Sequence, residues 1–416
     1  MREEIKEIAR QAKESSYILG KASSEIKNKA LHLMADKLGR NKEEILKENR
    51  KDVEKAKEKN LTPALIDRLT LNEKRILSMV KGINEVIDLP DPVGEVIKMC
   101  RRPNGLLVGK MRVPIGVIGI IYEARPNVTS DAAVLCLKSG NAVILRGGSE
   151  AYHSNRIIVK YLREGLVEAG LPAGSIQFLP FLEREAVKIL LRLSDYIDLI
   201  IPRGGEGLIK TVTEESTIPV IKHYKGICHV YVDEYADLNM AINISYNAKV
   251  QRPGVCNAME TLLVHEKIAS DFLPPMVEKF RKVGVELKGC GKTREIIHDI
   301  EKATEEDWTT EYLDLILSIR IVKDIEEAIR HINFYGSHHS DAIVTRDYRK
   351  AKKFLEEVDS AAVYVNASTR FTDGGEFGMG AEIGISTDKL HARGPMGLEE
   401  LTSYKFIIFG DGQVRK

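Results

Sequence analysis

One cysteine of the chain lies where a nucleophile could act. Cys256 belongs to residues 251–257, QRPGVCN, a stretch with proline and glycine directly before an apolar strand pattern. A cysteine in such a loop can be exposed, and its thiolate is a strong nucleophile once the pKa of the thiol is lowered. No triad is visible nearby, because His223 and His229 lie in or beside other strand patterns. Cys256 is therefore a candidate nucleophile, with an ordinary loop thiol as the open alternative.

The other four cysteines fit structural roles better. Cys136 falls on an apolar helix face, Cys228 at the start of a strand pattern, and Cys100 in a β-rich segment. Cys290 lies in the short loop 288–292, where an unreactive thiol is favoured. These cysteines are scattered and show no CxxC spacing, so the chain predicts neither a disulfide framework nor a metal site.

Asn127 is a candidate hydrogen-bond donor at the end of a strand pattern. It stands in residues 122–129, YEARPNVT, which follow the apolar run 117–122. Asparagine at such a place is commonly a turn residue or a helix cap, but its amide can also donate to a developing oxyanion. The residues alone leave both interpretations open.

Two glycine-containing loops could contact an anion. They are residues 146–150, RGGSE, and residues 202–207, PRGGEG, each placed after a strand pattern. Glycines let backbone N–H groups approach a phosphate, and a helix N-terminus adds partial positive charge. A tight turn explains either loop equally well, yet two such loops on neighbouring strands favour a dinucleotide site. The GxGxxG fingerprint does not occur after any strand pattern.

Apolar strand patterns and amphipathic helix patterns alternate along most of the chain and must position these residues. Strands without polar alternation, separated by such helices, predict parallel sheets covered on both faces. The alternation falls into two blocks, with a change of domain near Asp233. The first block predicts strands at 117–122, 142–145, 176–179, 196–201 and 218–221. The second predicts strands at 228–232, 260–265, 316–322, 341–345 and 361–365.

The remaining segments differ in character. About the first ninety residues predict helices, with the Lys- and Glu-rich stretch 41–60 as a solvated face. Pro274 and Pro275 interrupt the helix pattern over 269–283, so we expect a delayed or kinked helix there. Further strands are predicted at 93–97, 106–113 and 402–409.

Composition and charge limit the class of protein. The chain has 416 residues, of which 43% are hydrophobic, enough for two or three domains with buried cores. Its 62 basic and 61 acidic side chains leave a net charge of +1, which argues against nucleic acid or an anionic membrane as a partner. The N-terminus is charged, and no apolar run is long enough to cross a bilayer. We therefore expect a soluble, cytoplasmic protein.

Taken together, the motifs resemble the aldehyde dehydrogenase superfamily. The resemblance runs through residues 113–119, VPIGVIG, the turn at Asn127, and residues 140–146, GNAVILR. More narrowly, the chain is similar to the branch of that superfamily that reduces an acyl phosphate, and this match covers nearly the whole sequence. The motifs that carry the narrower match are residues 122–129, 146–150, 226–233, 251–257, 311–314 and 374–378.

The resemblance implies an α/β fold with two doubly wound parallel-sheet domains and a small β oligomerisation flap. Residues 1–96 and 116–227 would form the dinucleotide-binding domain, and residues 228–385 the catalytic domain. Residues 97–115 and 386–416 would form the flap and tail. Because such a flap pairs subunits in this superfamily, the resemblance also implies a homo-oligomer.

The reaction implied by the resemblance is the NADPH-dependent reduction of L-glutamyl 5-phosphate to L-glutamate 5-semialdehyde and phosphate. This is the second step of proline biosynthesis, and the upstream glutamate 5-kinase is a candidate protein partner. Cys256 aligns with the nucleophile of the superfamily, whose thiolate would displace phosphate and leave a thioester. Asn127, with the backbone N–H of Cys256, would hold the oxyanion.

The implied cofactor residues lie in both glycine loops and in one further motif. Arg146 matches the residue that binds the adenosine ribose, and Glu311 matches the glutamate that holds the nicotinamide ribose. Ser149 replaces the glutamate of NAD-preferring members, which favours NADP because a 2′-phosphate then has room beside Arg146. Arg203 replaces a usual glycine and weakens the expected pyrophosphate contact of its loop. The cofactor-binding residues are thus predicted as Arg146, Gly147, Ser149, Gly204, Gly205 and Glu311.

A missing residue separates this reaction from the hydrolytic alternative. Hydrolytic members carry a glutamate base near position 223, where this chain has His223 within residues 221–226, IKHYKG. An enzyme that transfers the acyl group to phosphate has no need to activate water. The alternatives are a hydrolytic NAD(P)-dependent dehydrogenase, a cysteine acyltransferase without nicotinamide, and a non-catalytic binding protein.

By charge alone, the candidates for the anionic groups of the substrate are Arg125, His223, Arg252 and Arg393.

Overall fold

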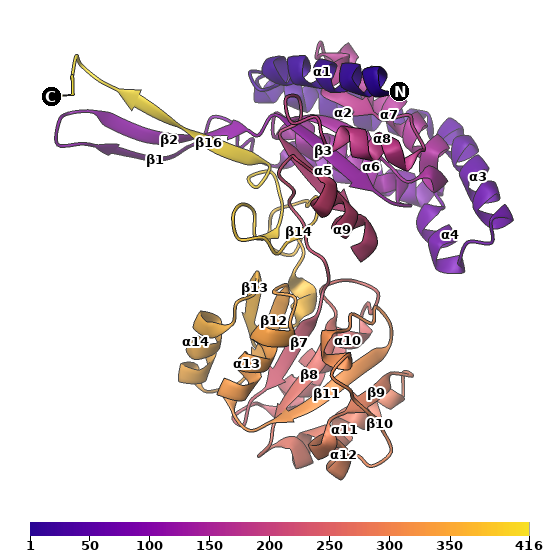
Figure 1. The fold of residues 1–416 in the computed structure, drawn as a ribbon, viewed down its shortest axis with the longest axis vertical. Helices are drawn as coiled ribbons and strands as arrows, with labels where there is room; N and C mark the ends of the chain where they lie inside the picture. The colour runs from indigo at the N-terminus through magenta and orange to yellow at the C-terminus, as the bar shows by residue number, and fades with distance from the viewer. Residues whose placement is uncertain (416) are drawn as a thin grey trace. The chain divides into compact units, whose positions relative to one another are not determined.

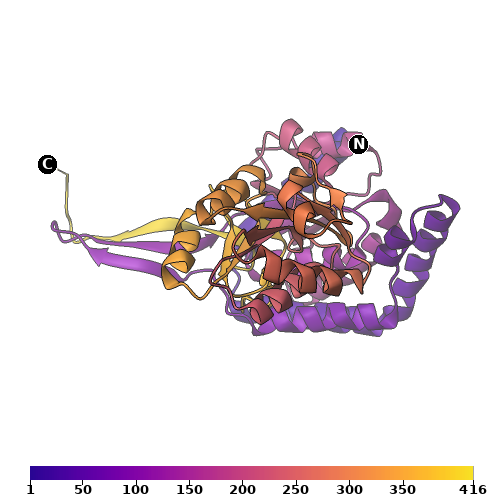
Figure 2. The same ribbon diagram turned by 90° about the horizontal axis from the view of Figure 1, so that it is seen from below.

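The computed structural model describes residues 1–415 (Figures 1 and 2). These residues divide into two compact units. Unit 1 comprises residues 1–222, 378–384 and 396–415, and unit 2 comprises residues 223–377 and 385–395. The division at residues 222 and 223 lies close to the predicted domain change. The cofactor-binding and catalytic roles expected of the two domains stay predictions.

Unit 1 is built on a four-stranded parallel sheet in the order β5-β4-β3-β6. Its strands are β3 (Val117–Tyr122), β4 (Ala142–Arg146), β5 (Ile176–Phe178) and β6 (Leu199–Arg203). Almost every strand side chain is buried, as expected for a parallel sheet covered on both faces. The helices are α1 (Arg2–Leu19), α2 (Ser24–Arg40), α3 (Lys42–Glu58), α4 (Pro63–Leu69), α5 (Glu73–Asp88), α6 (Pro126–Lys138), α7 (Tyr152–Glu168), α8 (Arg184–Leu190) and α9 (Glu206–Glu215), with short 3-10 helices η1 (Ser149–Ala151) and η2 (Ala173–Ser175).

The strand predicted at 218–221 was wrong. Val220 forms only an isolated parallel bridge with Ile200 of β6. The physical reason is Pro219, which has no N–H to donate to a continuous ladder.

Unit 2 is built on a seven-stranded sheet in the order β10-β9-β11-β8-β7-β12-β13, with every pair parallel. Its central strands β7, β8 and β12 are buried along their whole length, as expected for a parallel sheet covered on both faces. The strands are β7 (Cys228–Val232), β8 (Met259–His265), β9 (Glu286–Gly289), β10 (Glu301–Lys302), β11 (Ile316–Val322), β12 (Ser340–Val344) and β13 (Ala362–Val365). The helices are α10 (Leu238–Val250), α11 (Ala269–Arg281), α12 (Gly291–Ile296), α13 (Ile325–Tyr335) and α14 (Tyr348–Glu357), with 3-10 helices η3 (Asp307–Thr309) and η4 (Thr369–Phe371).

Two features of unit 2 depart from the sequence patterns. Strands β9 and β10 and helix α12 had no predicted counterpart, because they are short and β9 and β10 carry charged residues. Helix α11 continues through Pro274 and Pro275. The carbonyls that lose a donor there belong to Ser270 and Asp271 in the exposed first turn, where water can replace the missing N–H groups.

A small antiparallel sheet of unit 1 combines segments from both ends of the chain. It consists of β1 (Val96–Arg101), β2 (Leu107–Pro114) and β16 (Thr402–Phe409), in the order β1-β2-β16 (Figure 1). Unit 2 adds the two-stranded pair β14 (Ile385–Ser386) and β15 (Gly394–Pro395). Within residues 1–415, no helix has the length and apolar character that a membrane crossing requires. The small sheet exposes the large apolar side chains of Val96, Ile97, Met99, Tyr404, Phe406, Ile408 and Phe409.

Candidate active site

Cys256 lies in the loop that joins α10 to β8 in unit 2, with its side chain half-buried. The backbone of Gly226, just before β7, packs directly against it. A Cβ added to Gly226 would lie 1.9 Å from the carbonyl oxygen of Cys256 and 2.4 Å from its Cα. Only glycine fits at that position, so the close approach of the two backbones depends on residue 226 having no side chain.

Two side chains from other segments, and the Asn257 side chain itself, hold the backbone at and after Cys256. The buried thiol of Cys228 donates to the Cys256 carbonyl at 3.2 Å, and Thr369 Oγ1 donates to the Asn257 carbonyl at 2.7 Å. The Asn257 amide donates to the Thr372 carbonyl at 2.8 Å. Burial raises the pKa of the Cys228 thiol well above its ordinary value, so Cys228 stays a hydrogen-bond donor.

Glu311 reaches the same place through Gly226. Its Oε1 accepts the Gly226 N–H at 2.8 Å, and Gly226 packs directly on Cys256. Gly226 thus links the carboxylate to Cys256. The structure therefore brings together the predicted nucleophile and the residue expected to hold the nicotinamide ribose, although they are far apart in the sequence.

The predicted substrate-binding residues occupy different surroundings. Arg252 is exposed beside Cys256, and the ring of His223 lies 5.7 Å from that of His339, whose Nδ1 is 3.7 Å from Cys228 Sγ. Arg393 forms an ion pair with Asp359 at 2.8 Å, which makes it the least suited of the arginines to bind a substrate anion. In unit 1, the exposed side chain of Arg125 directly precedes α6.

Arg370 is a candidate that the sequence patterns missed. It lies in η4, and its Nε donates to Gln251 Oε1 at 2.9 Å, which places it at the start of the Cys256 loop. Burial and the neighbouring Arg252 guanidinium lower the pKa of Arg370. No local spacing relates η4 to the loop, because the contact depends on how the chain folds back after β13.

Asn127 lies in the first turn of α6 in unit 1. The helix begins at Pro126, because proline suits the first helical position. Arg125 is the N-cap residue, and the amide of exposed Asn127 instead donates to the Asp131 carboxylate at 2.9 Å. Burial raises the pKa of Asp131 to about 6, against the lowering effects of Asn127 and Arg203. The helix-cap interpretation of Asn127 therefore does not hold.

The raised pKa of Asp131 leads to a pH-dependent stability. A carboxyl that holds its proton more tightly when folded makes the protein less stable as pH rises from about 4 to 6. Asp131→Asn is expected to raise the free energy of unfolding at pH 7 by about 1 to 2 kcal/mol, since the amide carries no charge to desolvate. The gain should vanish near pH 4. Urea unfolding at both pH values checks this, and an unchanged difference between them would contradict it.

The predicted adenosine-ribose loop begins at the end of β4. Arg146 Nη2 donates to the Leu182 carbonyl at 3.1 Å, while its buried Nε has no hydrogen-bond partner within the described residues. A Cβ on Gly147 would lie 2.0 Å from Asn155 Nδ2, so this backbone also requires glycine. Ser149 opens η1, and its Oγ lies 3.5 Å from a carboxylate oxygen of Glu150.

The second glycine loop is already contacted by a carboxylate. The Gly205 N–H donates to Glu123 Oε2 at 3.1 Å, directly before α9 begins at Glu206. Gly204 packs against the same Glu123 side chain. A phosphate bound at this helix start would have to displace Glu123, so the arrangement disfavours the predicted pyrophosphate contact of Gly204 and Gly205.

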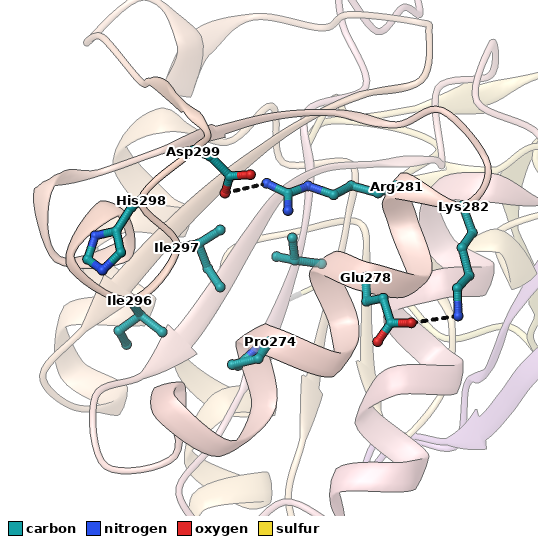
Figure 3. Close-up of a pocket in the computed structure, with 9 residues that line it drawn as sticks. Pro274, Glu278, Arg281, Lys282, Ile296, Ile297, His298 and Asp299 are labelled. Atoms are coloured by element: carbon teal, nitrogen blue, oxygen red, sulfur yellow. Dashed lines mark hydrogen bonds and ion pairs between the residues drawn. The ribbon is translucent and has the colours of Figure 1, made fainter.

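A groove of about 730 Å³ lies on unit 2 between α11 and residues 296–299 (Figure 3). Its charged side chains pair with one another, Glu278 with Lys282 and Arg281 with Asp299, each at 2.7 Å. It contains none of the predicted site residues, and we assign it no part in the reaction.

Comparisons with known proteins identify the family of the chain. The model of the "Aldehyde dehydrogenase family" matches residues 1–290 and 301–407. The chain is 62% identical to a γ-glutamyl phosphate reductase of Thermodesulfovibrio yellowstonii, over 99% of this chain and 100% of the relative. It is 61% identical to the enzyme of the same name from Carboxydothermus hydrogenoformans, over 99% and 100%. The crystal structure of γ-glutamyl phosphate reductase from Thermotoga maritima superposes with a TM-score of 0.98 at 54% identity, covering 99% of this chain and all of that one.

Proposed function

The chain belongs to the aldehyde dehydrogenase family, and from this membership we propose that it catalyses the NADPH-dependent reduction of L-glutamyl 5-phosphate to L-glutamate 5-semialdehyde and phosphate. The observation that carries the proposal is the position of Cys256. Gly226 and Cys228 hold its backbone, Thr369 holds that of the next residue, Asn257, and Glu311 accepts a hydrogen bond from the same Gly226. Two relatives that match over their full length are named γ-glutamyl phosphate reductase, and this name supports the proposed substrate.

Cys256 begins the reaction as the nucleophile. Its thiolate attacks the γ-acyl carbon, the bond to the phosphate oxygen breaks, and inorganic phosphate leaves while a thioester forms on Cys256. When bound, NADPH supplies the hydride that reduces the acyl carbon to the oxidation state of an aldehyde. The Cys256 sulfur then leaves as a thiolate and releases the semialdehyde.

Hydrogen-bond donors stabilise the oxygen that becomes charged in this sequence. From the membership of the chain in the aldehyde dehydrogenase family, we assign this role to the Asn127 amide and the Cys256 backbone N–H. Asn127 already makes a bond to Asp131, which orients the amide and leaves it a second N–H to donate.

The residues of unit 1 fit the adenosine end of the cofactor. The buried, unpartnered Nε of Arg146 can bind a polar group, and the guanidinium provides charge for a 2′-phosphate. Gly147 and Ser149 complete this contact, and Glu311 in unit 2 would hold the nicotinamide ribose. Because Glu123 contacts the 204–205 loop, we place the pyrophosphate contact elsewhere.

Substrate anions would meet arginines near Cys256. Arg252 and Arg370 carry two positive charges beside the loop, and the substrate has a carboxylate and a phosphate to match them. His223 takes the position of the hydrolytic glutamate and is a further candidate for the phosphate. The exposed apolar side chains of β1 and β16 support a homo-oligomer. The cytoplasm stays the expected location, and the upstream glutamate 5-kinase stays a candidate partner.

The dependence on phosphate tests the proposal. Purified protein is given glutamate 5-semialdehyde and NADP, and the absorbance of NADPH is followed with and without inorganic phosphate. We expect NADP reduction only with phosphate, and a lower rate with NAD in place of NADP. Equal turnover without phosphate would identify a hydrolytic dehydrogenase instead.

A further inference from the structure

A buried ion pair joins the two ends of the loop that carries Cys256. Lys249, at the end of α10, places its ammonium 2.6 Å from Glu260 Oε2 at the start of β8. Both side chains are 0% exposed. The pair therefore sets the separation between the point where the loop leaves α10 and the point where it enters β8.

The same carboxylate holds the segment that carries Glu311. Glu260 Oε1 accepts the Leu313 N–H at 3.2 Å, and Leu313 has a φ of 55°, which is unfavourable for a residue with a Cβ. A Cβ on Gly254 would lie 3.5 Å from the Leu313 carbonyl, so the two segments run side by side. One carboxylate thus contacts both chain segments of the proposed site.

Stability alone does not explain why a fully buried ion pair is present at this position. Burial raises the pKa of Glu260 to about 7 and lowers that of Lys249, because desolvation penalises both charged forms. Two apolar side chains of similar size commonly fill such a space with equal or greater stability. They could not, however, make directional bonds to each other and to the Leu313 backbone.

We propose that Lys249 and Glu260 are positioning residues that hold the Cys256 loop and the Glu311 segment in one fixed arrangement. The inference rests on the proposed function, in which these two segments meet substrate and cofactor. Gly226 provides the second link, because its N–H donates to Glu311 while its backbone packs on Cys256. With both links in place, neither segment can move alone, and a shift of about 1 Å at reacting atoms can lower a rate about 100-fold.

Two uncharged double variants separate the two contacts of the pair. Lys249→Met with Glu260→Gln keeps an amide oxygen for the Leu313 N–H, whereas Lys249→Met with Glu260→Met removes it. Neither variant leaves an unpaired buried charge, so both are expected to unfold at a urea concentration no lower than the parent protein. Glu260→Asp, which keeps both charges but has a shorter reach, is the variant to measure if a double variant does not fold.

Hydrogen–deuterium exchange measures how firmly the two segments are held, and it does not depend on enzyme turnover. We expect faster amide exchange at residues 251–257 in both double variants, and at residues 311–314 only when position 260 is methionine. The kcat should fall about 10- to 100-fold in both, and the Kd for NADPH should rise about 10-fold only in the second. Glu260→Asp should show the same changes to a smaller extent.

A second ion pair of unit 2, with one fully buried partner, is the control. Lys350 and Asp233 lie 2.8 Å apart, and Asp233 is fully buried, but the pair lies at the opposite ends of β7 and β12 from Gly226. Lys350→Met with Asp233→Asn should leave exchange at residues 251–257 unchanged and kcat within about twofold. Unchanged exchange and kcat in the Lys249 and Glu260 variants would overturn the positioning role. If the parent protein showed no phosphate-dependent turnover, the proposed function would fail, while exchange would still decide the positioning.

Discussion

Cys256→Ser is expected to abolish reduction of the acyl phosphate, with kcat lower by about 10⁴-fold or more. A serine hydroxyl at neutral pH is a far weaker nucleophile than a thiolate, and no other side chain can form the thioester. The fold should be unaffected, because the residue is only half-buried and serine is nearly the same size. We expect no turnover when NADPH absorbance is followed, and we expect the Kd for NADPH to be unchanged.

Cys290→Ser is the matched control for this substitution. Cys290 is also a half-buried cysteine of unit 2, but it contacts Thr293 at the start of α12 and none of the groups around Cys256. We expect its kcat to stay within about twofold of the parent protein, since no step of the mechanism uses it. A Cys256→Ser protein that kept most of its activity would show that the nucleophile is a different residue.

Asn127→Ala is expected to lower kcat by about 10²- to 10³-fold with little change in KM. The amide donates to an oxygen that carries negative charge in the transition state and not in the bound substrate, and losing one such donor has an effect of this size. Steady-state kinetics of the variant would measure both constants. A raised KM with an unchanged kcat would show instead that Asn127 binds the ground state of the substrate as strongly as the transition state.

Asn72→Ala separates this catalytic effect from a loss of stability. Asn72 is the N-cap of α5, and its side chain accepts the Arg75 N–H at 2.8 Å. Removing the cap should lower the free energy of unfolding by about 1 kcal/mol without a comparable fall in kcat. Asn127 caps no helix, so its variant should show the reverse pattern.

Most of the fold follows from short-range patterns in the chain. Continuous apolar runs such as 117–122 and 142–145 predict buried parallel strands, and the structure has β3 and β4 there. Pro274 and Pro275 mislead such patterns, because whether a proline breaks a helix depends on whether water can reach the carbonyls it leaves unpaired. Pro219 likewise lies in an apolar run that predicts a strand, but it has no N–H to donate to a continuous ladder, and only an isolated bridge forms there.

The candidate nucleophile could be found in the sequence because a cysteine between proline, glycine and a strand is a local arrangement. What surrounds it could not be found this way. Gly226, Glu260, Glu311 and Arg370 meet the Cys256 loop because β7 lies beside β8 and the later segments fold back onto the same sheet. Strand order and side-chain contacts across a sheet depend on the packing of the whole unit. Residue types and spacing therefore identify the chemistry, and three-dimensional packing selects the groups that position it.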